Sequence, residues 1–437
     1  MARRRTNIPL NVFLNGKLVG RFRRERTGAV DFQYDASWLD WESAIPVSLS
    51  LPLREDRYIG DPVIAVFENL LPDSADILRQ LAERTGADGT DAYSLLAQIG
   101  RDCVGALQFL PDGTDPDDVA AIDARPVRDA DIATIIDNLA RNPLGIDEDE
   151  AFRISIAGAQ EKTALLFWKK KWHVPHGTTA TTHILKPQLG VLPNGIDMSQ
   201  SVENEHFCMR LLANLGLPVA HTEIADFDGR HVLVVERFDR LWTKDKRLLR
   251  VPQEDCCQAL SVPPTRKYQS EGGPGIAEVS ELLKGSDDAS GDRRLFFKAQ
   301  LVFWLLAATD GHAKNFSLRL APGGRFRMTP LYDVMSAQPA HDANQIRRNQ
   351  LKLAMCVGDN RHYRVHSIAP RHFVQTADTC GMPAGTMEEL FVELVDALPA
   401  ALDATIAKMP DGFPAALFES IRDAALARLD QIARAKV

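Results

Sequence analysis

The most informative pattern in this chain is Ala307-Ala308-Thr309-Asp310-Gly311-His312-Ala313-Lys314-Asn315-Phe316, followed by Leu331-Tyr332-Asp333-Val334. Asp310 and Asn315 lie five positions apart, and Asp333 follows a segment with the pattern of a β-hairpin. Kinases use the same spacing of an aspartate, an asparagine and a second aspartate to hold metal and phosphate. The sequence therefore predicts an ATP-dependent kinase.

The chemistry of phosphoryl transfer explains these residue types. It requires a carboxylate that accepts or orients the proton of the attacking hydroxyl, and Asp310 suits this role of catalytic base. Asn315 and Asp333 suit the role of metal ligands, because Mg²⁺ takes one or two carboxylates together with phosphate oxygens. Taken singly, each aspartate is better explained as a loop carboxylate that caps a turn, so the prediction depends on the spacing and on the flanking elements.

The elements on either side of this pattern support it. Residues 295–308 are apolar nearly all round, which is typical of a buried helix that would present Asp310 at its C-terminal end. Residues 325–332 alternate after the turn Pro322-Gly323-Gly324, which predicts a strand with Asp333 at its end. Amphipathic helices are expected at 387–398 and 414–435.

Length and composition indicate the class of protein. With 437 residues, 45% hydrophobic and 25% charged, the chain has the composition of an ordinary soluble protein of two or three domains. A net charge of −8 argues against tight non-specific binding of nucleic acid. The six cysteines show no C-x-x-C spacing, so reduced thiols are expected. No apolar run reaches the roughly 20 residues that a bilayer requires, and no signal peptide is recognisable, so we expect a cytoplasmic protein without membrane contact.

Changes of pattern divide the chain into three parts. Residues 1–150 open with alternating strands around an Asn15-Gly16 turn and continue with helical patterns, which predicts a β-rich N-terminal domain with added helices. Short strands in residues 151–240 predict a β-rich nucleotide-binding lobe, and residues 241–437 predict a helical lobe that carries the catalytic loop. The expected fold class is α+β, a two-lobed, protein-kinase-like fold with a β-rich N-terminal subdomain and an all-α C-terminal lobe.

Two loops have the composition of segments that line an active site. Backbone N–H groups of Ala157, Gly158 and Ala159 can approach a phosphate, because small side chains let the main chain come close. The residues that complete this loop are also nucleotide-binding candidates: Gln160, Glu161 and Lys162. A single glycine is also explained by an ordinary turn. Residues 252–275, rich in proline and glycine, form a long loop of the kind that lines a substrate cleft.

Lys186 ends an apolar strand at 182–187, where kinases hold the ATP phosphates with a point charge. The competing explanation is a surface lysine on an edge strand. A helix predicted at 201–216 takes the place of the helix whose glutamate pairs with that lysine in protein kinases. Glu203 and Glu205 both qualify, and the sequence does not choose between them.

The strand that begins at residue 231 runs from apolar residues into a charged end, as expected for a hinge between two kinase lobes. Backbone groups from Glu236 through Phe238 would meet the adenine edge, and Asp239 would reach a ribose hydroxyl. The competing explanation is that these acids form surface salt bridges with Arg237 and Arg240.

Five segments carry a specific family resemblance: ISIAGAQEKTALL at 154–166, THILK at 182–186, ERFDR at 236–240, TDGHAKN at 309–315 and YD at 332–333. They resemble the HipA family of serine/threonine kinases, which are toxins of bacterial toxin–antitoxin pairs. Residues 67–73 and 99–106 also resemble that family, so the match spans nearly the whole chain.

The resemblance implies roles for individual positions. It makes Asp310 the catalytic base and assigns Mg²⁺ to Asn315 and Asp333. It places Lys186 at the ATP phosphates and residues 236–239 at the adenine and ribose. His312 and Lys314 are left as structural, substrate-facing or nucleotide-binding residues of the catalytic loop. Ser155 matches the serine that family members autophosphorylate, which would expel the glycine loop and switch the kinase off. About two negative charges beside the ATP phosphates would repel them.

The resemblance also implies cofactors and partners. ATP and Mg²⁺ are the expected cofactors. The family partner is a small helix-turn-helix antitoxin, HipB, which represses the shared operon, binds the kinase and recruits it to operator DNA. The best-known family substrate is glutamyl-tRNA synthetase, whose phosphorylation stops translation and induces dormancy and persistence.

Two other functions fit part of the pattern. A small-molecule kinase of similar lobed fold would share the ATP-site residues but lack autophosphorylation of Ser155. A pseudokinase that serves as a transcriptional co-repressor would bind ATP without turnover, and the intact set Asp310, Asn315 and Asp333 argues against it.

Overall fold

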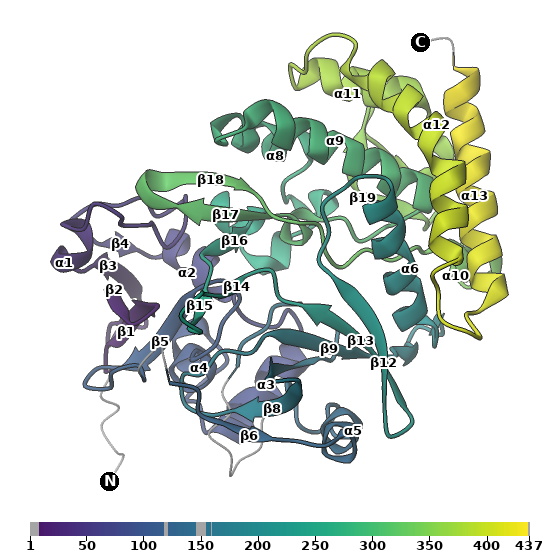
Figure 1. The fold of residues 1–437 in the computed structure, drawn as a ribbon. Coiled ribbons are helices and arrows are strands. Elements are labelled where there is room, and N and C mark those ends of the chain that lie inside the picture. Colours follow the sequence, from purple (N-terminus) through teal and green to yellow (C-terminus); the bar gives the residue numbers. More distant parts are fainter. Residues whose placement is uncertain (1–7, 118–120, 146–153, 159, 436–437) are drawn as a thin grey trace.

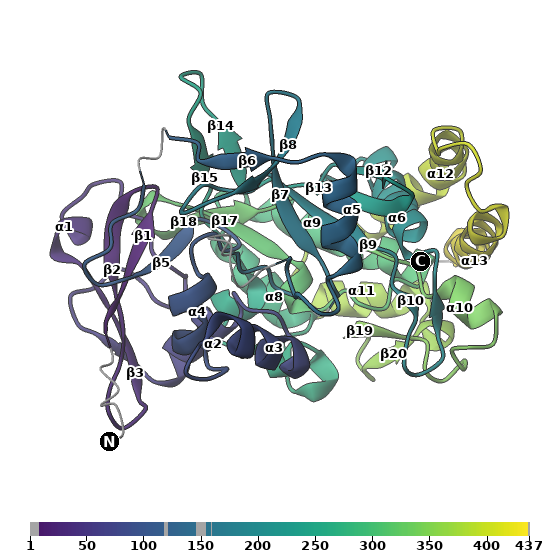
Figure 2. The ribbon, with the colours of Figure 1, turned by 90° about the horizontal axis from the view of Figure 1, so that it is seen from below.

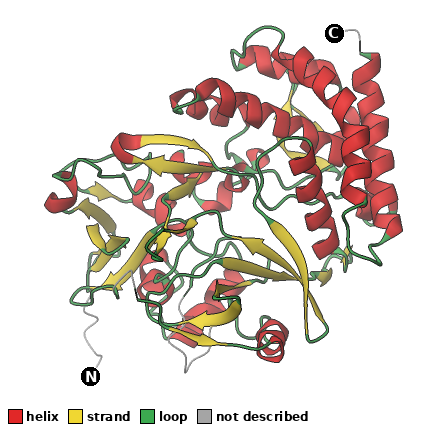
Figure 3. Ribbon diagram, viewed as in Figure 1, coloured by secondary structure: helices red, strands yellow, loops and turns green. Residues whose placement is uncertain are grey.

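The computed structural model describes residues 8–117, 121–145, 154–158 and 160–435. The chain has the expected α+β, two-lobed architecture, with strands concentrated toward the N-terminus and helices toward the C-terminus (Figures 1 and 3). Two large clusters of buried apolar side chains form separate cores, one mostly from residues before 190 and one from residues after 200. The expected boundary near residue 150 lies outside the described residues, and the three-part division of the chain stays a prediction.

A five-stranded antiparallel sheet opens the chain, in the order β4-β3-β2-β1-β5. Its strands are β1 (Leu10–Leu14), β2 (Lys17–Arg24), β3 (Val30–Tyr34), β4 (Tyr58–Ile59) and β5 (Leu107–Pro111). Asn15 and Gly16 have φ angles of 46° and 83°, as a two-residue hairpin turn requires, so the predicted hairpin is confirmed. The helices of this part are α1 (Ala36–Leu39), α2 (Asp61–Glu68), α3 (Ala75–Thr85) and α4 (Ala92–Ile99). The last three pack together beside this sheet and, in the view of Figure 2, below β6, β7 and β8 of the second sheet.

A six-stranded antiparallel sheet follows, in the order β12-β13-β9-β7-β8-β6. Its strands are β6 (Ala124–Pro126), β7 (Thr163–Trp168), β8 (Lys171–Pro175), β9 (His183–Pro187), β12 (Thr222–Phe227) and β13 (Arg230–Glu236). Helix α5 (Asp129–Asp137) contacts β12, and α6 (Ser201–Asn214) contacts β12 and β13. A small hairpin, β10 (Gly190–Val191) and β11 (Asp197–Met198), lies between β9 and α6 in the chain. Because β9 lies between β13 and β7, the edge-strand explanation for Lys186 is wrong.

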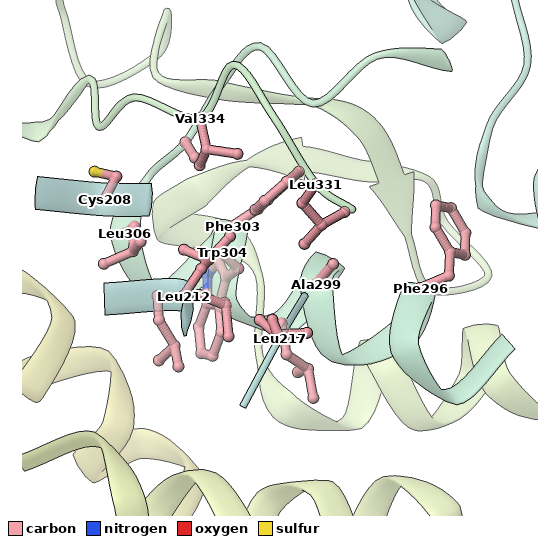
Figure 4. Close-up of a cluster of buried hydrophobic side chains, with 14 of the residues drawn as sticks. Cys208, Leu212, Leu217, Phe296, Ala299, Phe303, Trp304, Leu306, Leu331 and Val334 are labelled. Atoms are coloured by element: carbon pink, nitrogen blue, oxygen red, sulfur yellow. The ribbon is translucent and has the colours of Figure 1, made fainter. Parts of the chain in front are cut away.

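Helices dominate the C-terminal lobe. They are α7 (Cys256–Ala259), α8 (Ile276–Leu282), α9 (Ala289–Leu306), α10 (Gln338–Asp342), α11 (Pro370–Thr379), α12 (Thr386–Ile406) and α13 (Ala415–Arg434), with the 3-10 turns η1 (Pro264–Arg266), η2 (Gln269–Glu271), η3 (Leu283–Gly285), η4 (Ala313–Asn315), η5 (Pro322–Gly324) and η6 (Val365–Ser367). The predicted buried helix is α9, in which every side chain from residue 296 to 306 is buried. Phe303 and Trp304 lie among Leu212, Leu217 and Leu331 in the core (Figure 4). This packing fixes the end of α9 from which the catalytic loop starts.

The C-terminal lobe also contains strands, which the expected all-α description omits. They are β14 (Arg240–Trp242), β15 (Leu248–Arg250), β16 (Gln253–Asp255), β17 (Ser317–Ala321), β18 (Arg325–Met328), β19 (Lys352–Val357) and β20 (His362–Arg364). Strand β18 is the strand predicted before Asp333, but it ends at Met328, so the expectation that Asp333 sits at a strand end is wrong. Pro330 lacks an N–H group and cannot continue the ladder, and Leu331 forms an isolated parallel bridge with Val219.

Two further expectations concern the cysteines and membranes. All six cysteines are buried and have free thiols, as the sequence predicts. None of the helices in the described part of the chain combines the length and apolarity needed to cross a membrane.

Candidate active site

Lys186 lies near the end of β9, with its ammonium group buried between two carboxylates. Its Nζ lies 2.8 Å from Oε1 of Glu205 on α6 and 2.8 Å from Oδ1 of Asp333. Burial alone would lower the pKa of Lys186, but the charges of Asp333 and Glu205 outweigh it and raise the pKa above its ordinary value. The lysine is therefore a fixed positive charge. Of the two glutamates that the sequence left open, Glu205 is the partner, whereas Glu203 accepts a hydrogen bond from Gln188 at 2.7 Å.

The catalytic loop starts where α9 ends. Ala307 caps the helix with a left-handed φ of 51°, which turns the chain out of the core. Nδ2 of Asn315 donates a hydrogen bond to the backbone oxygen of Asp310 at 2.7 Å and so closes the loop. The Asp310 side chain is 56% exposed, so its carboxylate is accessible to an incoming hydroxyl group.

Asp333 has a φ of 60°, a left-handed conformation that aspartate tolerates better than most residues. Burial raises its pKa, but the positive charges of Lys186 and Lys162 outweigh that effect and hold the pKa well below its usual range. Asp333 is thus an ionised carboxylate that the backbone presents to the same space as Lys186.

The glycine loop is held in place by the N-terminal part of the chain. Ile154 forms a parallel bridge with Asp102, and Gly158 forms one with Pro72. The backbone N–H of Asp73 donates to the Gly158 carbonyl at 3.2 Å. The N-terminal part therefore sets the position of the loop that the sequence assigns to phosphate.

Lys162 packs against the glycine loop at position 158. Its Nζ donates to the carbonyl of Ala157 at 2.9 Å. Gly158 has a φ of 110°, which favours glycine, and a Cβ there would also require Nζ of Lys162, 2.4 Å away, to move. Burial and the positive charge of Lys186 lower the pKa of Lys162 to about 8.

One cavity of about 510 Å³ joins these segments, a volume in the range of small-molecule sites. The predicted site residues that line it are Ala157, Gly158, Gln160, Lys162, Lys186, Glu236, Phe238, Asp239, Asp310, His312, Lys314, Asn315 and Asp333. Glu161 is exposed and lines a second cavity of about 250 Å³. Ala159 lies outside the described residues. The residues of the catalytic loop, the glycine loop and β9 thus share one space.

Asp239 is bound differently from the expectation of a free ribose ligand. Its carboxylate accepts two hydrogen bonds from Arg237, at 2.9 and 2.8 Å, and one from the backbone N–H of Gly105 at 2.7 Å. Nη1 of Arg240 lies 3.0 Å from the same carboxylate. These ion pairs are those of the competing explanation, except that they are buried and not on the surface. The Glu236 side chain, in contrast, is 60% exposed.

Ser155 lies behind the glycine loop. Its hydroxyl is fully buried and donates to the carbonyl of Leu70 at 2.7 Å. Its backbone N–H donates to the carbonyl of Asp102 at 3.0 Å. The structure therefore holds this hydroxyl away from solvent and against the N-terminal part of the chain.

His312 and Lys314 differ in where their side chains point. Nε2 of the buried His312 lies 3.8 Å from Oδ1 of Asp310, and burial lowers the pKa of this imidazole. Nζ of Lys314 lies 2.7 Å from Oδ1 of Asp73 and 3.3 Å from the carbonyl of Asn69. These contacts tie the Lys314 side chain to the N-terminal part of the chain.

Sequence analysis missed two residues of this site. Asp73 binds Lys314 and also Lys267, whose Nζ lies 2.6 Å away. Tyr268, in the loop expected to line the cleft, donates its hydroxyl hydrogen to the carboxylate of Asp310. No local pattern indicates either contact, because the partners are far apart in the chain.

The donor set fits Mg²⁺. Among the described residues, no group of three or more histidine, cysteine, aspartate or glutamate side chains is placed to hold a metal ion. Mg²⁺ requires less, because phosphate oxygens and waters supply most of its ligands. Asp333 uses Oδ1 for Lys186, which leaves its second oxygen, and Asn315 uses Nδ2 for its hydrogen bond, which leaves its Oδ1. One carboxylate and one amide oxygen suffice when a nucleotide binds with the ion.

Comparisons with known proteins agree with this geometry. Residues 10–110 match the HipA N-terminal domain, and residues 154–402 match the HipA-like C-terminal domain. The chain is 37% identical to the candidate kinase Y4mE of Sinorhizobium fredii over 353 residues, 80% of each chain. It is 28% identical to the serine/threonine-protein kinase toxin HipA of Shewanella oneidensis over 385 residues, 85% of this chain and 83% of that protein.

A solved structure extends the likeness to the fold. The complex of HipA, HipB and operator DNA from the Shewanella oneidensis MR-1 toxin–antitoxin system contains a chain that superposes with a TM-score of 0.81 at 25% identity. The likeness covers 98% of this chain and 100% of that one. The two lobes therefore form a kinase-like fold of the HipA type, and the chain belongs to the HipA family of kinases.

Proposed function

We propose that this protein is an ATP-dependent serine/threonine protein kinase and the toxin of a toxin–antitoxin pair. The observation that carries the proposal is the convergence of Lys186, Asp310, Asn315 and Asp333 on one cavity of about 510 Å³. Their arrangement supplies a fixed cation for phosphate, an exposed carboxylate for the attacking hydroxyl and two oxygen donors for Mg²⁺.

Each residue has a defined task in this proposal. Lys186, oriented by Glu205, neutralises phosphate charge, and the main chain of the glycine loop covers the phosphates. Asp310 orients the attacking hydroxyl and accepts its proton. Mg²⁺, held by Asn315 and Asp333, neutralises the charge of the transferred phosphoryl group when it is bound. Backbone groups from Glu236 to Phe238 contact the adenine at the rim of the cavity.

The proposed partners follow from the relatives. A HipA chain of the same fold is found with HipB and operator DNA in the Shewanella oneidensis complex, and the likeness covers 98% of this chain. We therefore propose a HipB-like helix-turn-helix antitoxin as partner, contact with operator DNA through that complex and a cytoplasmic location. The proposed substrate is a protein, with glutamyl-tRNA synthetase as the first candidate, whose modification would block translation and promote dormancy.

Autophosphorylation of Ser155 would switch the enzyme off. The buried hydroxyl is bound to Leu70, so its exposure moves residues 154–158 away from the N-terminal part of the chain. A phosphate of about two negative charges cannot return to that buried position without a partner cation. The glycine loop would then stay displaced from the nucleotide.

The proposal is tested by mass spectrometry of the full chain after incubation with ATP and Mg²⁺, with glutamyl-tRNA synthetase added as an acceptor. We expect phosphate on Ser155 and on the acceptor with the wild type, and none with Asp310→Asn. Asp359→Asn, on the exposed loop between β19 and β20, is the matched control and should behave as the wild type.

Calorimetric titration with ATP, read together with the phosphate-transfer assay, separates the alternatives. A wild-type chain that binds ATP but transfers no phosphate to itself or to any protein would be a pseudokinase. A chain that phosphorylates small molecules and leaves Ser155 unmodified would be a small-molecule kinase. Either result contradicts the proposal.

A further inference from the structure

We propose that Tyr268 is a positioning residue of this kinase: its hydroxyl holds one oxygen of the Asp310 carboxylate, so that the other oxygen faces the attacking hydroxyl of the substrate. The inference rests on the proposed function and adds a residue from outside the catalytic loop. Tyr268 lies between η1 and η2, 42 residues before Asp310 in the chain.

The hydrogen bond has a specific geometry. The Tyr268 hydroxyl donates to Oδ1 of Asp310. Within the described part of the chain, it is the sole side chain or backbone group that donates a hydrogen bond to this carboxylate. Asn315 and the backbone N–H of His312 donate to the backbone oxygen of Asp310, at 2.7 and 2.9 Å, and do not restrain the side chain. Nε2 of His312 lies 3.8 Å from Oδ1 of Asp310, beyond hydrogen-bond distance. Tyr268 therefore sets the rotation of a carboxylate that is otherwise 56% exposed.

The ring of Tyr268 is itself held in place. It packs edge-on against His312, with ring centroids 4.9 Å apart and planes at 83°. Burial and the negative charge of Asp310 raise the pKa of the Tyr268 phenol, which therefore stays protonated and remains a donor at neutral pH. The tyrosine thus presents its hydroxyl from a fixed position.

The loop that carries Tyr268 is anchored at several points. Nζ of Lys267 lies 2.6 Å from Oδ2 of Asp73. The backbone N–H of Gly273 donates to the Tyr268 carbonyl at 2.9 Å, and a Cβ at Gly273 would lie 1.9 Å from the carbonyl of Arg266, so the turn requires glycine. Oε1 of Gln269 accepts a hydrogen bond from the backbone of Cys356 at 2.8 Å. Such anchoring favours a positioning role over that of a mobile cover.

Fixing one oxygen of the Asp310 carboxylate affects how the other oxygen accepts a proton. In the transfer step, the substrate oxygen forms a bond to the γ-phosphorus of ATP, the bond from that phosphorus to the β,γ-bridging oxygen breaks, and ADP leaves with the electron pair. The proton of the substrate hydroxyl passes to Asp310. A carboxylate already fixed through Oδ1 can take this proton on Oδ2 without first losing rotational freedom.

The same contact permits an opposite explanation. The Tyr268 hydroxyl donates to Asp310 as a serine or threonine substrate would, so the tyrosine would block the acceptor position. The two explanations predict changes of opposite sign when the hydroxyl is removed. One variant therefore decides between them.

The deciding variant is Tyr268→Phe, which keeps the ring against His312 and removes the hydroxyl. We expect the rate of phosphate incorporation at saturating ATP to fall about tenfold or more. The Kd for ATP should stay within about twofold of the wild type, because Tyr268 acts on Asp310 and not on the nucleotide. The control is Tyr58→Phe, which removes a tyrosine hydroxyl bound to the carbonyl of Pro52 at 2.5 Å, far from the site, and should leave the rate unchanged.

Each outcome has a distinct meaning. A Tyr268→Phe chain that is as active as the wild type, or more active, would overturn the inference, and higher activity would show that the tyrosine blocks the acceptor. A fall in rate that is matched by a fall in melting temperature or in ATP affinity would show a structural role and overturn it as well. A wild type that transfers no phosphate in the same assay would overturn the proposed function and, with it, this inference.

Discussion

Asp73 and Lys314 form a buried ion pair, with 2.7 Å between Oδ1 and Nζ, although 241 residues separate them in the chain. Asp73 follows α2 in the N-terminal part, whereas Lys314 belongs to η4 in the catalytic loop. The same carboxylate binds Lys267, in the loop that carries Tyr268. The N-terminal part therefore contributes directly to the position of the catalytic loop.

Replacing this carboxylate tests that contribution. Asp73→Asn leaves the buried Lys314 and the half-buried Lys267 without their counter-charge, so we expect the free energy of unfolding to fall by about 3 kcal/mol. The rate of phosphate transfer should fall too, because both loops around Asp310 lose an anchor. Urea unfolding followed by circular dichroism measures the first effect.

The matched control for Asp73 is Asp76→Asn. Asp76 lies 3.0 Å from Arg79, but its side chain is 76% exposed. Its removal should change the free energy of unfolding by less than about 0.5 kcal/mol, since exposed ion pairs contribute little. Equal effects of the two variants would show that the pairs of Asp73 do not stabilise the fold.

Glu205 and Glu203 give a second comparison, between neighbours on one helix. Glu205 binds Lys186 through both oxygens, at 2.8 and 3.1 Å, whereas Glu203 binds Gln188. We expect Glu205→Gln to weaken ATP binding about tenfold, because the lysine loses a charged partner that orients it. Glu203→Gln should stay within about twofold. Calorimetric titration with ATP measures both, and a larger loss with Glu203→Gln would contradict the assignment of Glu205.

Replacing Asp239 tests whether its carboxylate has a structural role or binds the nucleotide. Asp102 binds Arg237, Arg240 and Arg250, and Asp239 binds two of the same arginines from the hinge. Asp239→Asn should therefore lower the free energy of unfolding by about 3 kcal/mol, as should Asp102→Asn, because each leaves buried guanidinium groups uncompensated. Differential scanning calorimetry measures this loss.

The ATP affinity of the folded Asp239→Asn chain provides the opposing test. If the carboxylate contacts the ribose, the variant would keep the stability of the wild type and bind ATP at least tenfold more weakly. With a structural role, the Kd at a temperature well below unfolding should change by less than about threefold. The hydrogen bonds observed for Asp239 favour the structural role.

These contrasts show which parts of the molecule are predictable from sequence. Helix α9 and the β1–β2 hairpin follow from local patterns, an all-apolar run and an Asn15-Gly16 turn, and both are confirmed. The spacing of Asp310, Asn315 and Asp333 correctly brings them to one cavity with Lys186. Local periodicity and motif spacing suffice when a residue's role is set by its own element or loop.

Long-range ion pairs were not predictable in the same way. The sequence shows Asp239 beside Arg237 and Arg240, but not that Asp102 and Gly105 approach from the N-terminal part and bury the group. From the sequence alone, charged residues at the end of a strand are expected to be exposed, because the segments that bury them come from distant parts of the chain. The partner of Lys314 and the contact of Tyr268 were missed for the same reason.

Glu254 on β16 provides a prediction for pH dependence. Its side chain is fully buried, and burial raises its pKa to about 8, with Oε1 accepting a hydrogen bond from the backbone of Leu49 at 2.8 Å. The folded state thus keeps a proton that the unfolded chain loses near pH 4.5, so this group should make stability fall as pH rises from about 4.5 to about 8. The side chain in Glu254→Gln resembles the protonated acid, so this variant should reduce the dependence of stability on pH. Glu223→Gln, at an exposed position on β12, is the control and should leave it unchanged. Urea unfolding at a series of pH values measures the slope, and an unchanged slope in Glu254→Gln would show that Glu254 is already ionised in the folded chain.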